Sequence, residues 1–292
     1  MPYLIFVIAG ISLISYIFAL LIKKTNLKII GFSIGLLLFV LSIVLTLIYY
    51  YPIFDKGYFD EGIKTFIWFT GLTALLTIIF IPIRFFIKIP DYIFRKILHI
   101  TAISMMSILI IIPTQWWISE IILGIITVGI ITVLLIFESL KYYQDLFIEK
   151  GKHEILLSIL MFFVLSAVLI AFFFGYRGNE HKYYVIIALL SWGLGDAAAS
   201  VFGHLLGKHK VSGKFIEGIK SIEGSVACFL FAFVISLILL IVLMHYILWL
   251  ALLESILIGV VVSLSELFTK KGMDNLTCPI AASIILFLFS LI

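Results

Sequence analysis

An aspartate, Asp196, lies inside the apolar run ALLSWGLGDAAASVFGHLLG. A carboxylate at the centre of a membrane helix costs about 2.5–3.5 kcal/mol on insertion scales, so it usually faces a cavity or a partner and marks function. The structural alternative is a hydrogen bond between helices, or a position close to the membrane surface. By a spacing of three or four residues, one face of this helix would carry Asp196, Ser200, Gly203 and Gly207. A stripe of small residues alone favours tight helix packing, but a carboxylate beside it favours a site.

A basic loop follows over residues 204–222, with the side chains of His204, Lys208, His209, Lys210, Lys214 and Lys220. Flexible lysines and the exposed N–H groups of glycines suit a polyphosphate. Ser221 and Glu223 are typical of the start of a helix, where backbone N–H groups attract anions. The alternative is an ordinary basic loop that contacts anionic lipid.

Two further polar clusters are expected on the same side of the membrane. FRKILH places Arg95 and His99 one helical turn apart, with Lys96 beside them, although a basic flank with an interfacial histidine would have the same pattern. SELFTKKGMDN ends in Asp274 and Asn275, which are common in turns but are also hard oxygen ligands for magnesium. Neither cluster defines a chemistry alone, so their shared side is the informative observation.

Membrane helices must position these clusters. Hydrophobic residues make up 64% of the 292 residues and charged residues only 12%, and the mean hydropathy is +1.29. A soluble domain has about 45–50% apolar and about 25% charged residues. In a membrane protein, the basic residues that give the net charge of +4 indicate which side of the membrane each loop faces. No nucleic-acid partner is expected. The two cysteines show neither a disulfide framework nor metal-ligand spacing.

The predicted fold is an all-α, polytopic integral membrane helix bundle with about ten transmembrane helices, since a span needs about 20 apolar residues. The expected ranges are 3–22, 29–51, 65–87, 97–113, 118–138, 155–175, 183–203, 223–244, 247–268 and 276–292. Residues 84–96 mix aromatic and basic side chains, which favours an interfacial helix. With this span count, one set of loops holds 16 of the 20 Lys and Arg residues, and the other set holds Lys56, Lys64, Arg177 and Lys182. This bias predicts that the first set is cytoplasmic and that both termini lie outside.

The order of these clusters resembles the motifs of the CTP-dependent lipid kinases, which include dolichol, phytol and farnesol kinases and fungal diacylglycerol kinases. The early Arg-Lys-x-x-His motif is matched by Arg95, Lys96 and His99. The central glycine-rich motif is matched by Gly195, Asp196, Ala199, Gly203, Gly207 and Lys208. The next motif is matched by Lys220, Ser221, Glu223, Gly224 and Ser225, and the last one by Glu266, Asp274, Asn275 and Pro279. The phosphatidate cytidylyltransferases are more distantly similar, and the last motif departs from theirs.

The resemblance implies a kinase-like membrane domain over residues 91–292, preceded by spans without a recognised motif over residues 1–90. It implies transfer of a phosphoryl group from CTP, with Mg²⁺, to the hydroxyl of a membrane isoprenoid alcohol such as dolichol, another polyprenol, phytol or geranylgeraniol. The implied catalytic residues are Asp196, His99 and Glu223. The implied nucleotide contacts are Arg95, Lys96, Gly203, Gly207, Lys208, Lys220, Ser221 and Gly224. The implied magnesium ligands are Asp196, Asp274 and Asn275.

The expected location is the plasma membrane of a prokaryote or the endoplasmic reticulum of a eukaryote, with the site on the cytoplasmic side. Two alternatives remain: synthesis of a CDP-lipid, as in the cytidylyltransferases, and a transporter that uses Asp196 as an ion site. The transporter is disfavoured because the spans show no evident two-fold pattern and the polar clusters gather at one face. The preference for CTP rests on the resemblance, since no residue is identified that would read the base.

Overall fold

The computed structural model describes residues 56–87, 89–137, 154–213, 216, 220–269 and 273–291. This part of the chain is all-α, as predicted, with eight α-helices. A π-helical segment, Ile170–Tyr176, and a short 3-10 turn, Asn179–His181, connect two of them.

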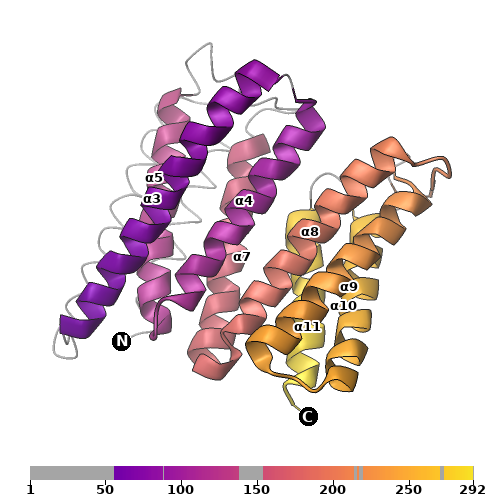
Figure 1. The fold of residues 1–292 in the computed structure, drawn as a ribbon. Helices are drawn as coiled ribbons and strands as arrows, with labels where there is room; N and C mark the ends of the chain where they lie inside the picture. Colours follow the sequence, from indigo (N-terminus) through magenta and orange to yellow (C-terminus); the bar gives the residue numbers. More distant parts are fainter. Residues whose placement is uncertain are drawn as a thin grey trace, which may run out of the picture. The chain divides into compact units, whose positions relative to one another are not determined.

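The eight helices match eight of the predicted spans (Figure 1). They are α3 (Lys56–Ile87), α4 (Asp91–Ile111), α5 (Trp116–Phe137), α7 (Glu154–Leu169), α8 (Tyr183–Leu205), α9 (Ile222–Met244), α10 (Leu248–Phe268) and α11 (Asp274–Phe289). The other two predicted spans, 3–22 and 29–51, lie outside the described residues.

Six of the described helices are long and apolar enough to cross a membrane, judged by length and composition. The chain is therefore an integral membrane protein with six candidate spans in its described part, where eight of the ten predicted spans fall. The apolar helix α11, Asp274–Phe289, is shorter. Its 16 residues extend about 24 Å, which is less than the hydrocarbon thickness of about 30 Å.

Residues 84–96 do not form the separate interfacial helix that their composition predicted. Helix α3 continues through Arg84 to Ile87, and α4 begins at Asp91, directly after Pro90. Proline breaks a preceding helix but is tolerated at the start of the next one, because it lacks an N–H group that would be unpaired there anyway. The Arg84 guanidinium donates to the Ile89 carbonyl at 3.0 Å, which stabilises the short connection.

The chain divides into two compact units. The first comprises residues 1–64 and 121–160, whose described parts belong to α3, α5 and α7. In the second, residues 65–120 and 161–292, helix α8 packs against α4, α9, α10 and α11. Most residues of α8 between Tyr184 and Ala199 are buried, so α8 is the central helix of this unit.

Helices α8 and α9 approach closely through glycines. A Cβ atom added at Gly224 would lie 2.9 Å from the carbonyl oxygen of Ala199 and 3.2 Å from the Cα atom of Gly203. A Cβ atom at Gly195 would lie 3.1 Å from the sulfur of Cys228. The small residues of the motif therefore allow two backbones to pack together, which is their common role in membrane helices.

Basic side chains cap two helix C-termini in the second unit. Lys182 donates to the carbonyl groups of Ile111, at 3.3 Å, and Pro113, at 3.1 Å, at the end of α4. Arg177 donates to the Ser290 carbonyl at 2.9 Å, just after α11. The last carbonyl groups of a helix lack internal donors and carry partial negative charge, so cations suit them.

Candidate active site

Polar side chains from several segments meet at one end of the second unit. Helix α4 brings Lys96 and α8 brings Asp196. The residues before α9 bring Lys220, the last turn of α10 brings Glu266, and the first turn of α11 brings Asp274. The charges of Lys96, Lys220, Glu266 and Asp274 each lie within electrostatic range of Asp196. The structure thus brings together residues from all the predicted polar segments.

Asp196 is buried, with 5% of its surface exposed, and it forms an ion pair with Lys96. The Nζ atom of Lys96 lies 2.5 Å from Oδ2 of Asp196. A buried carboxylate needs such a partner, because its desolvation is otherwise uncompensated. The pair joins α4 to α8, so it is also the interhelical contact that the structural interpretation of Asp196 predicted.

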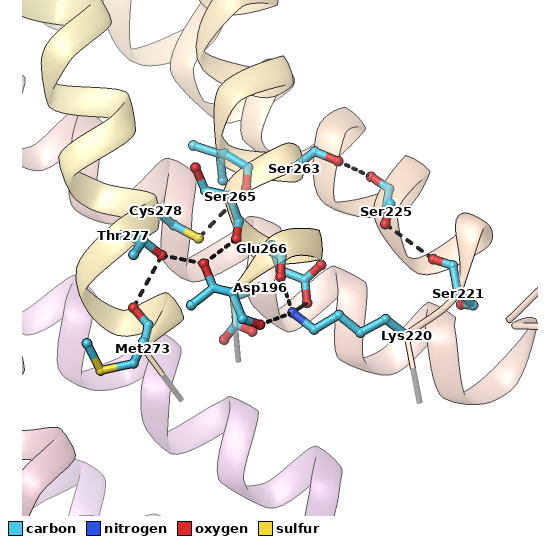
Figure 2. A network of polar contacts seen from close by, with 12 residues as sticks. Asp196, Lys220, Ser221, Ser225, Ser263, Ser265, Glu266, Met273, Thr277 and Cys278 are labelled. Atoms are coloured by element: carbon cyan, nitrogen blue, oxygen red, sulfur yellow. Dashed lines mark hydrogen bonds and ion pairs between the residues drawn. The ribbon is translucent and has the colours of Figure 1, made fainter. Parts of the chain in front are cut away.

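Lys220 holds the C-terminal end of α10. Its Nζ atom lies 3.1 Å from Oε1 of Glu266 and donates to the backbone carbonyl groups of Glu266 and Thr269, the latter at 2.9 Å (Figure 2). An ammonium group has three N–H donors, and these contacts engage all of them. The arrangement makes Lys220 a helix-capping residue and does not favour its predicted contact with a phosphate.

Threonine hydroxyls join the end of α10 to the start of α11 (Figure 2). The hydroxyl of Thr269 donates to the Ser265 carbonyl at 2.5 Å and lies 2.8 Å from the hydroxyl of Thr277. These contacts join the end of α10 to the first turn of α11, which begins with Asp274 and Asn275. Both residues are half-buried.

The predicted magnesium ligands have suitable chemistry. Asp196 and Asp274 lie within electrostatic range of each other, and Asn275 follows in the first turn of α11. Carboxylate and amide oxygens are hard ligands of the kind that magnesium prefers. In the described part of the chain, no three His, Cys, Asp or Glu side chains are grouped to hold a metal ion. Phosphate oxygens and water would therefore have to complete the coordination of a magnesium ion here, as is common for this metal.

The described residues at the two ends of the predicted basic loop pair as the base of a hairpin. The N–H group of Val211 donates to the Lys220 carbonyl at 2.9 Å, and that of Ile222 to the His209 carbonyl at 3.0 Å. Glu223 accepts from the backbone N–H of His209 at 3.2 Å and lies 2.7 Å from its Nδ1 atom. Glu223 thus joins the two sides of the hairpin at its base, and its catalytic role stays a prediction.

The predicted nucleotide contacts divide into packed and exposed residues. Ser221 caps α9, because its hydroxyl accepts from the N–H group of Gly224 at 3.2 Å. Gly203 and Gly207 face this serine, and a Cβ atom at Gly203 would lie 3.3 Å from its Oγ atom. These four residues form the junction between α8 and α9. By contrast, two predicted contacts have exposed side chains at the same end, Arg95 and Lys208.

His99 lies one helical turn from Lys96, deeper along α4. Its ring contacts Trp192 edge to face, with centroids 4.8 Å apart, and its Nε2 atom is buried without a hydrogen-bond partner in the described residues. Sequence reasoning missed Trp192, and it also missed Thr269 and Thr277. The available signal for Trp192 was its position four residues before Asp196, which places both on one face of α8.

Comparisons with known proteins add no assignment. No protein-family model matches this chain, and neither a curated protein nor a solved structure matches it. The fold and the composition define the class as an all-α integral membrane protein. The resemblance to CTP-dependent lipid kinases stays a prediction from the sequence motifs.

Proposed function

We propose that this chain is a CTP-dependent kinase that phosphorylates the hydroxyl group of a membrane isoprenoid alcohol. The observation that carries the proposal is the meeting of Lys96, Asp196, Lys220, Glu266 and Asp274 at one end of a membrane helix bundle. The four motifs that resemble the kinases contribute these residues, with Glu266 and Asp274 both in the last motif. A site for a charged cosubstrate and a lipid alcohol requires such a meeting point at the membrane surface.

Phosphoryl transfer depends mainly on positioning and on charge neutralisation. Arg95 and Lys208, whose side chains are exposed, would bind the phosphates from the aqueous side. A phosphate near Lys96 offers this lysine a second anion, which frees Oδ2 of Asp196 to accept the proton of the alcohol. Magnesium, bound by Asp196, Asp274 and Asn275, would neutralise negative charge on the phosphates.

The remaining motif residues would support this geometry. Lys220 holds the end of α10 in place, and Ser221 with its glycine neighbours fixes the junction of α8 and α9. His99 lies one turn deeper than Lys96, where the apolar chain of the alcohol would pass. Its role in the proposal is to orient the hydroxyl group.

The proposed topology is the one that the distribution of basic residues predicts. It has ten spans, both termini outside, and the site on the cytoplasmic side. CTP would then bind from the cytoplasm, and the alcohol would enter from the bilayer. The membrane would be the plasma membrane of a prokaryote or the endoplasmic reticulum of a eukaryote.

The test is a transfer assay with the purified chain in lipid nanodiscs. CTP labelled in its γ-phosphate is incubated with Mg²⁺ and a panel of polyprenols, phytol, geranylgeraniol and diacylglycerol, with ATP and GTP as competitors. We expect a labelled prenyl monophosphate and CDP. Release of pyrophosphate when phosphatidate replaces the alcohol would instead identify a cytidylyltransferase. The absence of both products, together with ion flux that depends on Asp196, would identify a transporter.

A matched control comes from an exposed carboxylate elsewhere in the second unit. The side chain of Glu180 is 73% exposed, in the 3-10 turn before α8. Glu180→Gln removes one negative charge, as Asp196→Asn does, and we expect it to keep the transfer rate of the unmodified chain. If both variants lost the same activity, the effect would not be specific to Asp196.

A further inference from the structure

Glu254 is a buried acid that the proposed kinase does not use. It lies in α10 and is 0% exposed, and both of its carboxylate oxygens lack a hydrogen-bond partner in the described part of the chain. An ionised carboxylate without a partner in a membrane-embedded interior costs several kcal/mol. The group must therefore be neutralised, either by its own proton or by a bound cation.

Two tyrosine hydroxyls lie within electrostatic range of this acid. They belong to Tyr184 of α8 and Tyr246 of the turn between α9 and α10, and they form a hydrogen bond with each other. Burial raises the pKa of Tyr246, so its hydroxyl stays protonated. The mutual bond uses one of the two hydroxyl hydrogens and leaves the other as a free donor in this pair. Carboxyl and phenol oxygens together are hard ligands for a small cation.

Among the residues that the structure describes, the surrounding helices do not supply a neutralising charge in contact with Glu254. Arg177 is the cation in electrostatic range of Tyr184, but it donates to Ser290 and lies over the ring of Phe287. No ion pair joins Arg177 to Glu254 among the described residues. Helices α9 and α11 each carry one charged residue, Glu223 and Asp274, in their first turns at the other end.

This acid is separate from the candidate active site. Glu254 precedes Glu266 by twelve residues in the same helix, which corresponds to about 18 Å along its axis. The two polar centres therefore lie toward opposite ends of α10.

We propose that Glu254, together with the hydroxyl pair of Tyr184 and Tyr246, binds a single positive charge, carried by a proton or by a sodium ion. The site does not depend on the proposed kinase activity. Its two possible occupants share one chemistry, which is neutralisation of a buried carboxylate by a small cation at hard oxygen ligands.

Dicyclohexylcarbodiimide, an apolar reagent for protonated carboxyl groups, tests the proposal. The acid adds across one C=N bond and then rearranges to a stable N-acylurea, so the modified peptide gains the whole mass of the reagent. We expect mass spectrometry of the full-length chain in nanodiscs to find this adduct on Glu254. Glu254→Gln should lose it, and Asp196→Asn should retain it on Glu254.

Sodium distinguishes the two occupants. A lower rate of modification in sodium chloride than in choline chloride identifies sodium as the bound cation, whereas equal rates identify the proton. Failure to modify Glu254 in either salt, under conditions in which a reference membrane protein with a buried acid is modified, would overturn the proposal.

A stability measurement provides an independent check. Glutamine has nearly the shape of a protonated glutamate, so Glu254→Gln should keep the thermal unfolding midpoint in choline chloride. A large drop would mean that Glu254 is ionised and paired within the protein, for instance through a water to Arg177, and would count against the proposal. If this variant does not fold, the modification of the unaltered chain still decides the matter.

Discussion

At the scale of single residues, two lysines of the same motif region have different surroundings. Lys220 is largely buried and bonded to the end of α10, whereas Lys208 is exposed at the end of α8. Both are basic residues of one loop in the sequence, so composition alone treats them alike. Their different burial assigns a capping role to Lys220 and leaves Lys208 available to a ligand.

The first prediction separates these two lysines. Lys220→Met should lower the free energy of unfolding by about 1–3 kcal/mol, because partly buried acceptors of Glu266 and Thr269 lose their donor. Lys208→Met should change this stability little but raise the KM for the nucleotide. Thermal unfolding and transfer kinetics on both variants check this. Equal unfolding midpoints for the two variants would show that Lys220 does not stabilise α10.

A second prediction concerns the Lys96–Asp196 ion pair. Asp196→Asn should reduce turnover by about 100-fold or more, as expected when a positioned proton acceptor is lost. Lys96→Met should cost about 3–5 kcal/mol of stability, because it leaves a buried carboxylate unpaired. The double variant should cost less than Lys96→Met alone, since no unpaired charge remains. Strictly additive stability losses would show that the two side chains do not interact.

At the scale of elements, the glycines of the central motif act through helix packing. Gly224 allows α9 to touch the backbone of α8 at Ala199 and Gly203. The sequence motif shows which positions are small, but it does not show that two backbones meet there. A substitution at such a position therefore affects the helix pair as a whole.

A third prediction follows from this contact. Gly224→Ala should lower the free energy of unfolding by about 1–3 kcal/mol, because its methyl group would overlap the Ala199 carbonyl. Gly71→Ala in α3 is the matched control, since no atom lies within 4 Å of the added Cβ atom. There we expect a gain of up to about 1 kcal/mol from helix propensity. The unfolding midpoints of the two variants check the prediction, and similar losses in both would contradict it.

The helices themselves could be predicted well, because each is a long apolar run bounded by charged or turn residues. The prediction of an interfacial helix at residues 84–96 was wrong. Pro90 precedes the start of a new helix there, and this effect outweighs the amphipathic composition. The sequence predicted the site only as a set of polar and charged residues on one side of the membrane. Which lysine pairs with Asp196, and which one caps α10, depends on how α4 and α10 pack, and this information is not local in the sequence.

At the scale of the whole molecule, the distribution of basic residues predicts which ends of the helices face the cytoplasm. Helix α8 lies within a candidate span from Asn179 to Leu205. Its two ends should therefore be accessible from opposite sides of the membrane. The native cysteines, Cys228 and Cys278, are both 0% exposed, so they should contribute little background to thiol labelling.

A fourth prediction uses this low background. In vesicles with the cytoplasmic face inward, a membrane-impermeant maleimide should label Glu180→Cys but not Lys208→Cys. Inverted vesicles should give the opposite result. Labelling of both variants from the same side would mean that α8 does not cross the bilayer in the proposed way.

The base of the hairpin after α8 is fastened twice, by His209 to Glu223 and by Lys220 to Glu266. These contacts should keep α8 beside α9 even if the chain is cut between the two sides of the hairpin. Two separately translated fragments, divided between Gly213 and Ile216, are therefore expected to reassemble when they are co-expressed. Such a split protein would have Asp196 on one polypeptide and Asp274 on the other, so a genome could encode this site as a pair of subunits.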